Sequence, residues 1–202
     1  MTRVFAIFAA LVLVGFAAIL GVPSANSQTG PGWTQLFDGK TLDGWTPSND
    51  EVNWRVEDGA IVADKKKGKG NPVLISKSSY KDFEIYAEFW VSDDANSGIY
   101  IRCTDPKNIN SKSSYEVNIF DRRPDPKYGT GGIVDVAAVN PMPKAGGRWN
   151  TFEVTARGPL MTVVMNGVKT SEGKDDRFGS GPIALQYGDG VVKFRKVAIK
   201  PL

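Results

Sequence analysis

From residue 33 onward the sequence consists of short runs in which apolar and polar residues alternate, separated by glycine, asparagine, aspartate and proline. None of these runs keeps the three-to-four spacing of an amphipathic helix. Successive side chains of a strand point to opposite faces, so each run predicts a strand with one buried face. Many short strands joined by turn residues indicate an all-β sandwich of two antiparallel sheets. The predicted strands are 34–37, 54–57, 60–63, 73–76, 83–92, 98–103, 115–120, 151–157, 160–165, 168–170, 182–186 and 191–200.

Two turns and one long loop organise this pattern. Asp58-Gly59 and Asn166-Gly167 each lie between two predicted strands, and both pairs suit the positive φ angles of two-residue hairpin loops. The segment 121–148 is rich in proline and glycine and predicts a long loop. Loops of this length in a compact domain are usually functional, so we expect this one to border the functional face.

The N-terminus has the pattern of a secretory signal peptide. Arg3 supplies a positive charge, residues 4–20 are almost wholly apolar, and small residues follow at 23–27. We therefore predict a signal peptide over residues 1–27 and a single domain over 28–202, secreted or periplasmic. The alternative is an uncleaved membrane anchor. After cleavage we expect no stable membrane insertion.

The totals narrow the function. A formal net charge of +3 gives no reason to expect nucleic acid as a partner. The chain has no histidine, which excludes Ser-His-Asp catalysis, Cys-His catalysis and histidine-containing metal sites. Cys103 is the only cysteine, so no disulfide forms within the chain. Alternation places Cys103 on the core side with Ile99 and Ile101.

Three central runs carry polar residues on the face opposite to their apolar one. If the three strands share a sheet, one face of that sheet combines carboxylates, a guanidinium, an amide and aromatic rings, as a sugar-binding or sugar-cleaving cleft requires. The outward positions are Glu84, Tyr86, Glu88 and Trp90 in the first run, Tyr100 and Arg102 in the second, and Glu116, Asn118 and Phe120 in the third.

An ordered set of motifs resembles one known family over residues 33–202. The motifs are WTQLFDGKTLDGW (33–45), WRVEDG (54–59), YKDFE (80–84), EF (88–89), NSGIYIR (96–102), YEV (115–117), GRWN (147–150), NG (166–167), GPIALQ (181–186) and VKFR (192–195). The chain is similar to the 3-keto-disaccharide hydrolase family, also described as 3-keto-glucoside-1,2-lyase/3-keto-2-hydroxy-glucal hydratase domains. The resemblance implies a concanavalin A-like jelly-roll sandwich that acts on glycosides oxidised at C3. Many relatives carry Asp-His after the Leu-Gln of the penultimate strand, where this chain has Tyr187-Gly188-Asp189.

Chemistry at a 3-keto-glycoside needs a base at C2, a group that stabilises the enolate oxygen, and an acid at the leaving oxygen. Glu116 is the candidate base, Arg102 the candidate enolate stabiliser and Glu88 the candidate acid. The alternative for the first two is a structural ion pair between them. For Glu88 the alternative is an ordinary exposed or edge-strand carboxylate. Candidate substrate contacts are Asn96, Asn118, Gln186, Trp90, Tyr100 and Asp189, although Asn96 and Asp189 also fit plain turn chemistry.

Other functions remain open from the residues alone. A non-catalytic carbohydrate-binding module, a structural or adhesive domain and a two-carboxylate glycosidase fit the same face, the last less well. If a divalent metal is bound, oxygen-only ligands favour calcium over zinc. The expected partner is a carbohydrate, a 3-keto-glycoside, and the sequence carries no signal of an oligomeric state.

Overall fold

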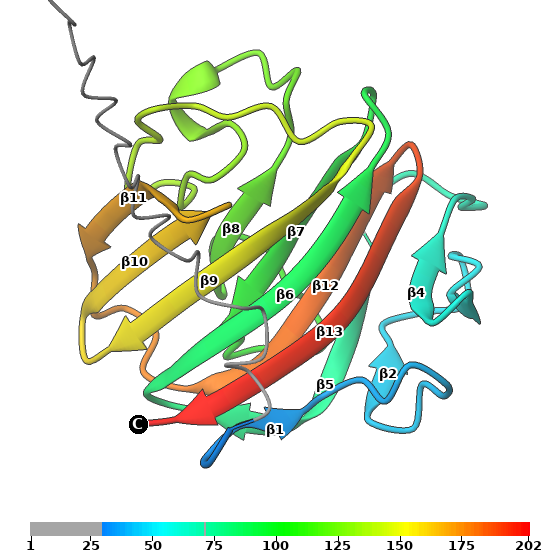
Figure 1. Ribbon diagram of the computed structural model, residues 1–202, viewed down its shortest axis with the longest axis horizontal. Helices are drawn as coiled ribbons and strands as arrows, with labels where there is room; N and C mark the ends of the chain where they lie inside the picture. Colours follow the sequence, from blue (N-terminus) through cyan, green and yellow to red (C-terminus); the bar gives the residue numbers. More distant parts are fainter. Residues whose placement is uncertain (1–29, 71) are drawn as a thin grey trace, which may run out of the picture.

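The computed structural model describes residues 30–70 and 72–202, which form two stacked antiparallel sheets (Figure 1). The predicted all-β sandwich is confirmed. The larger sheet, sheet A, has the order β11-β10-β9-β6-β13-β4-β3, with β1 also on β13; the smaller, sheet B, has the order β2-β5-β12-β7-β8. The strands are β1 (Thr34–Gln35), β2 (Trp45–Pro47), β3 (Arg55–Glu57), β4 (Ala60–Ala63), β5 (Val73–Tyr80), β6 (Phe83–Val91), β7 (Asn96–Ile101), β8 (Tyr115–Ile119), β9 (Trp149–Arg157), β10 (Leu160–Met165), β11 (Val168–Lys174), β12 (Gly181–Asp189) and β13 (Val192–Pro201).

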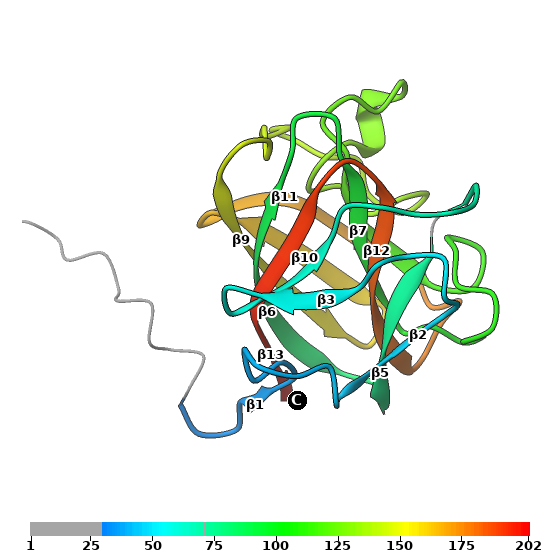
Figure 2. The same ribbon diagram turned by 90° about the vertical axis from the view of Figure 1, so that its right-hand side faces the viewer.

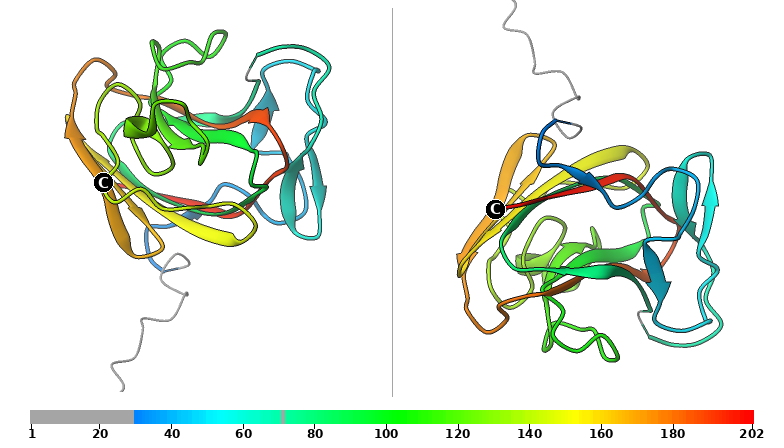
Figure 3. Two further views of the ribbon diagram at one scale, coloured as in Figure 1. Left: turned by 90° about the horizontal axis from the view of Figure 1, so that it is seen from above. Right: turned by 90° about the horizontal axis from the view of Figure 1, so that it is seen from below.

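The hydrophobic core lies between the two sheets, which Figure 3 shows as separate layers from above and below. The inward positions of β6 are filled as alternation predicts, by Ile85, Ala87, Phe89 and Val91. Phe89 packs against Phe152 of β9 with ring centroids 4.6 Å apart. Each sheet therefore keeps a second, outward face, and these two faces lie on opposite sides of the molecule.

Strand β2 is the element that the sequence pattern misses. It has three residues and ends in Pro47, so it shows no alternation that a pattern search can detect. Trp45 is buried, and its indole Nε1 donates a hydrogen bond of 2.8 Å to the carbonyl of Leu36. One tryptophan thus fixes this short edge strand to the chain segment that follows β1.

The expectation that the three polar strands share a sheet is wrong. Strand β6 lies inside sheet A between β9 and β13, whereas β7 and β8 form one edge of sheet B. Local alternation fixes which side chains of a strand point the same way, but the sheet that the strand joins depends on distant partners. The polar residues of β6 therefore face away from those of β7 and β8.

The predicted orientations of Arg102 and Cys103 are also wrong. Strand β7 ends at Ile101, and Arg102 takes a left-handed backbone with φ +53°, which reverses the alternation. Cys103 is buried as expected, but on the outer face of sheet B with Tyr100 and Ala184. Burial raises the pKa of its thiol to about 12, so the thiol stays protonated and unreactive.

Two loops cover part of the outer face of sheet B. In the loop between β7 and β8, Ile109 packs against the apolar cluster that contains Cys103. In the 120–148 segment, Val134 N donates to Glu116 O and Gly131 N donates to Asn118 O, which extends the sheet beyond β8. The short 3₁₀ helix η2 (Pro126–Tyr128) belongs to the same segment. This loop borders the polar positions of β8, as the sequence predicts.

The chain enters the fold at β1, beside the C-terminal end of β13 (Figure 2). The predicted signal peptide over residues 1–27 lies outside the described residues. Among the residues that are described, no helix is long and apolar enough to cross a membrane.

Candidate functional site

Outward side chains form two rows across sheet B, and each row changes from apolar to polar toward β8. Register pairs define the rows, so neighbours within a row lie side by side. The first row is Ile75, Ala184, Tyr100 and Glu116, and the second is Val73, Gln186, Gly98 and Asn118. The polar ends of the two rows form the candidate site.

Gly98 brings together two side chains that start far apart. Glu116 on β8 and Gln186 on β12 are separated by β7, and two strand spacings amount to about 9.5 Å. A Cβ added at Gly98 would lie 3.2 Å from Gln186 Oε1 and 3.5 Å from Glu116 Cγ. The two side chains therefore lean toward each other over Gly98. A larger residue there would separate them.

Glu116 is the buried carboxylate of this site, with 8% of its surface exposed. Burial raises its pKa above the ordinary value of 4.5, because the charged form loses its hydration. The positive charge of Arg123 and hydrogen bonds with Tyr100 and Gln186 oppose this shift without cancelling it, and nearby Asp135 adds to it. A carboxylate with a raised pKa binds a proton more readily near neutral pH, as a general base must.

Tyr100 and Gln186 hold each other beside Glu116. Gln186 Nε2 donates a hydrogen bond of 3.0 Å to the hydroxyl of Tyr100, and both side chains are almost fully buried. Burial and the charge of Glu116 raise the pKa of Tyr100, so its hydroxyl stays protonated and can donate. Only 4% of the surface of Tyr100 is exposed, as low as for its neighbours in the site, and its stacking role stays a prediction.

Three polar atoms around Glu116 have no hydrogen-bond partner among the described protein atoms, although they are buried: Asn118 Oδ1, Gln186 Oε1 and Arg123 Nε. Asn118 Nδ2 donates to the carbonyl of Tyr128 at 2.6 Å, which fixes the orientation of this amide. An unpaired buried polar group costs about 1–3 kcal/mol, so each one calls for an explanation, such as a ligand or a water molecule that completes its hydrogen bonds. Two amide oxygens beside a carboxylate suit the hydroxyl groups of a ligand.

A surface hollow lies beside Val73, at one end of the second row. Val73 and Ile109 line a hollow of about 200 Å³ together with Lys69 and Gly70. Val73 pairs with Gln186 and is the apolar end of the second row, so this hollow lies on the β5 side of the site. Glu116, Tyr100, Gln186 and Asn118 do not line this hollow.

Asn96 and Asp189 lie at the end of the site. A Cβ at Gly188 would come within 2.8 Å of Asn96 Nδ2, so Asn96 lies over the position that the family pattern gives to histidine. Lys66 Nζ donates to the carbonyl of Gly188 from the loop after β4. Asp189 is exposed, and its Oδ1 accepts a 3.0 Å hydrogen bond from Gly190 N. This contact supports the turn interpretation of Asp189.

Glu88 does not belong to this site. It lies on the outer face of sheet A, where its carboxylate accepts hydrogen bonds from Arg195 Nε at 2.5 Å and Lys196 Nζ at 2.7 Å. Burial alone would raise its pKa, but these two cationic donors outweigh burial and lower it. Trp90 lies on the same face, with Lys193 Nζ 5.3 Å from its ring centroid. Both residues are therefore on the far side of the sandwich from Glu116.

Arg102 does not contact Glu116 either. Its guanidinium is 2% exposed and donates to the carbonyls of Lys81 and Gly158, each at 2.7 Å, and to Asp82 Oδ1 at 2.9 Å. These contacts join three loops at one end of the sandwich. The expected proximity of Arg102, Glu88 and Glu116 is wrong, because one residue has reversed backbone and another belongs to the other sheet.

The positive group near Glu116 is instead Arg123, which sequence reasoning missed. The sequence does hint at a cation here, because Arg122-Arg123 closely follows the predicted strand 115–120 that carries Glu116. Asp135 gave no such signal, since its approach depends on a left-handed backbone at φ +61° within the long loop. Loop residues that approach a strand from a distance leave little trace in local sequence.

No metal is assigned to the site. Within residues 30–70 and 72–202, no three or more Asp, Glu, Cys or His side chains are grouped so that they could hold an ion. The oxygen groups in contact with Glu116 are a hydroxyl and a neutral amide, and Asp135 is the one further carboxylate that acts on it, a poor match to the carboxylate-rich shells of calcium.

Fold and site define the class: a two-sheet β-sandwich with a buried carboxylate among amide groups on one outer face. Residues 32–200 match the family model described as a 3-keto-alpha-glucoside-1,2-lyase-like domain, and the chain belongs to this family. It is 30% identical over 151 residues to the 3-keto-disaccharide hydrolase of Bacteroides thetaiotaomicron. That match covers 61% of this chain and 52% of the relative, so the chain spans about half the relative's length.

Solved structures show the same fold. A protein from Parabacteroides distasonis described as a glycosyl hydrolase superposes with a TM-score of 0.75 at 22% identity, covering 89% of this chain and 98% of that one. A carbohydrate-binding module from Bacillus subtilis superposes with a TM-score of 0.61 at 16% identity, covering 78% and 95%. These similarities confirm the predicted jelly-roll sandwich.

Proposed function

We propose that this protein is a carbohydrate-active enzyme that cleaves 3-keto-glycosides, with Glu116 as the base that removes the C2 proton. Family membership supports the substrate class. The observation that carries the proposal is the meeting of Glu116 and Gln186 over Gly98, with Tyr100 bound to Gln186 and with burial raising the pKa of the carboxylate. The 3-keto-disaccharide hydrolase relative supports the same net reaction.

The reaction follows from the acidity that the C3 carbonyl gives to the C2 proton. Glu116 takes that proton, and the C–H electron pair forms an enolate with its charge on the C3 oxygen. The enolate then expels the C1 oxygen, which leaves with the bonding pair and gains a proton as the aglycone alcohol. Water adds to the resulting 2-hydroxy-glucal, with its oxygen at C1 and a proton at C2. The net change is hydrolysis of the glycosidic bond.

The residues of the site divide these tasks. Arg123, with Nε free of protein hydrogen bonds, stabilises the developing charge on the C3 oxygen. Glu116 carries the abstracted proton and returns it to the leaving oxygen, a role that its raised pKa favours. The amide oxygens of Asn118 and Gln186 accept hydrogen bonds from sugar hydroxyls. No histidine is needed in this scheme, which suits a chain that has none.

The test is release of a chromogenic aglycone from a 3-keto-glucoside. We expect release from the oxidised substrate and none from the matching unoxidised glucoside, which has no acidic C2 proton. In deuterated water the product should carry deuterium at C2, because the enolate and the glucal are protonated from solvent. Absence of release from the keto substrate, or equal release from both substrates, would count against the proposal.

A non-catalytic carbohydrate-binding module remains the second candidate. The specific observation is that the orphan amide oxygens suit sugar hydroxyls whether or not a bond breaks. Calorimetric binding of a 3-keto-glycoside without any aglycone release would favour this function.

The proposal includes export to the periplasm or outside the cell, through the signal peptide predicted at residues 1–27. N-terminal sequencing of the native protein should give a chain that begins close to residue 28. Recovery of the uncut chain in the membrane fraction would favour the anchor alternative.

A further inference from the structure

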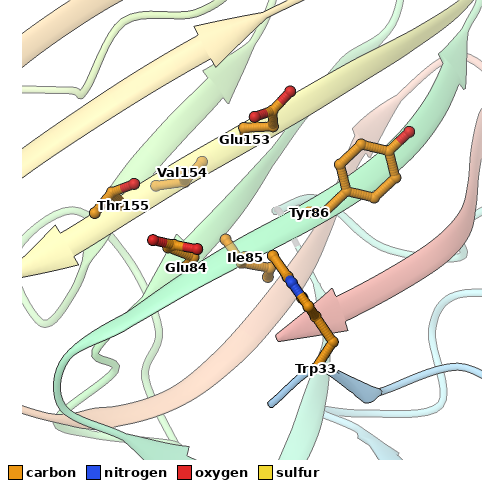
Figure 4. Close-up of a pocket in the computed structure, with 7 residues that line it drawn as sticks. All are labelled: Trp33, Glu84, Ile85, Tyr86, Glu153, Val154 and Thr155. Atoms are coloured by element: carbon orange, nitrogen blue, oxygen red, sulfur yellow. The ribbon is translucent and has the colours of Figure 1, made fainter. Parts of the chain in front are cut away.

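A second hollow lies on the outer face of sheet A, on the opposite side of the sandwich from Glu116. Its volume is about 330 Å³, within the range of small-ligand sites. Two aromatic residues and three polar residues shape it: Trp33, Tyr86, Glu84, Glu153 and Thr155. In the close-up, the indole of Trp33 stands at one side, and Glu84, Glu153 and Thr155 rise from the neighbouring strands (Figure 4).

The position of Trp33 is built by the fold. Thr34 pairs with Ile199 on β13, which anchors the strand that begins directly after Trp33. Before it, Trp33 N donates to the carbonyl of Gly30 at 3.2 Å, and Gly32 has a φ of +86° that favours glycine. The indole is thus held over the sheet by a turn on one side and a strand pair on the other.

The polar side chains come from register pairs of two central strands. Glu84 is opposite Thr155, and Tyr86 is opposite Glu153, on β6 and β9. Adjacent pairs on one face place their side chains within a few ångströms of each other. The hydroxyl of Tyr86 donates to Glu88 Oε1 at 3.2 Å, which fixes the ring at the edge of the hollow.

The charges closest to the hollow are close to balanced, and Lys193 lies elsewhere on this face, over Trp90. Lys200 Nζ lies 3.5 Å from Glu84, while Arg195 and Lys196 hold Glu88. With Glu153, three carboxylates thus face three cations. A cationic ligand gains little from such a surface, because its positive charge would meet nearly zero net charge. A neutral ligand fits better, and paired carboxylates still keep lone pairs that accept hydrogen bonds.

We propose that this hollow binds a neutral saccharide of one or two units, separately from the Glu116 site. The indole supplies an apolar wall for the C–H face of a sugar ring, and Glu84 and Glu153 accept hydrogen bonds from its hydroxyls. The carboxylates are acceptors only, so a hydroxyl suits them and a ketone oxygen does not. The hollow therefore prefers the unoxidised sugar, opposite to the substrate proposed for Glu116, and the inference does not depend on that function.

The test is isothermal titration calorimetry with maltose and cellobiose, each compared with its 3-keto derivative, on the Glu116→Gln protein to prevent turnover. We expect binding of at least one unoxidised disaccharide. Trp33→Ala should weaken it at least tenfold and Glu153→Gln several-fold. Trp149→Ala is the matched control, since Trp149 is exposed on the same face and stacks under Arg195 at 3.8 Å. It should leave the affinity unchanged.

The contrary outcomes are equally definite. No heat with either disaccharide, unchanged affinity in both Trp33→Ala and Glu153→Gln, or tighter binding of tetramethylammonium than of sugar would overturn the proposal. Circular dichroism melting of each variant checks that a lost affinity is not a lost fold. If Trp33→Ala fails to fold, Glu153→Gln decides alone, because its side chain is exposed and its loss leaves the core intact.

Discussion

Glu116 and Glu88 are two outward-facing glutamates of one sandwich, and their environments move their pKa values in opposite directions. Burial raises the pKa of Glu116 on sheet B. For Glu88 on sheet A, burial acts in the same sense, but hydrogen bonds from Lys196 and Arg195 outweigh it and lower the pKa. A strand position that points away from the core thus says little about chemistry. The partners supplied by neighbouring strands and loops decide whether a carboxylate becomes a base or half of an ion pair.

The difference comes from what covers each face. On sheet A the neighbouring strand β13 supplies Arg195 opposite Glu88, and Lys196 follows in a left-handed bulge with φ +49°. On sheet B the neighbours of Glu116 are a tyrosine and a glutamine, and long loops exclude water without providing a close ion pair. Sheet A therefore stabilises the charged form of its glutamate, whereas sheet B favours the protonated form.

The largest expected effect separates the two glutamates by activity. Glu116→Gln should lower kcat for aglycone release by about 10³-fold, since positioned general bases contribute 10²- to 10⁴-fold. Glu88→Gln, the matched control on the other sheet, should stay within about threefold of the parent protein. Steady-state kinetics on a 3-keto-glucoside measure both. An inactive but folded Glu88→Gln protein would remove the functional distinction between the faces.

Arg123→Gln should have the next largest effect. Its positive charge lowers the pKa of Glu116, so removing it should raise that pKa further and move the acid limb of kcat/KM to higher pH. Loss of charge stabilisation at the C3 oxygen should also reduce kcat by about 10- to 100-fold. The exposed neighbour Arg122 provides the control, and Arg122→Gln should leave both the limb and kcat unchanged. If the acid limb of the kcat/KM profile does not move, the charge of Arg123 does not influence the pKa of Glu116.

Gly98→Ala should disturb the site by geometry alone. The new Cβ would lie 3.0 Å from the carbonyl of Val117 and 3.2 Å from Gln186 Oε1, which pushes Gln186 away from Glu116. Misplacement of a catalytic contact by a few tenths of an ångström should reduce kcat by about tenfold. Gly179→Ala is the control, because nothing lies within 4 Å of that Cβ. Equal kcat values for the two variants would contradict the role given to Gly98.

Alternation in the sequence predicted the sandwich, the inward faces of most strands and the outward positions of Glu116 and Asn118. It could not predict that β6 pairs with β9 and β13, because sheet membership depends on contacts between residues far apart in sequence. It could not predict Arg102 either, since an arginine at φ +53° breaks the alternation without a glycine to mark it. Arg123 reaches Glu116 from a loop, where no periodicity constrains direction.

The smallest expected effect is on stability, and here the two glutamates differ in sign. Unfolded Glu116 ionises near its ordinary pKa of 4.5, whereas the folded protein holds its proton to a higher pH. The unfolded state therefore binds fewer protons in this window, and stability falls as pH rises through it, by up to about 1.4 kcal/mol per pH unit. Glu116→Gln should remove this fall and make the protein more stable at pH 7.

Glu88→Gln should have the opposite effect. The pKa of Glu88 is lower in the folded protein than its ordinary value of 4.5. Ionised Glu88 therefore stabilises the fold above pH 4.5, and this stabilisation is lost as the pH falls through the folded pKa. This variant should be less stable than the parent at pH 7, and the deficit should shrink toward acid pH. Urea unfolding between pH 3 and pH 8 measures both slopes on one scale. A Glu116→Gln protein that is less stable than the parent at pH 7 would mean that the buried carboxylate is satisfied by its neighbours. The charges of Glu116 and Glu88 would then both stabilise the fold, and the two glutamates would no longer differ in this respect, whatever the activity of either variant.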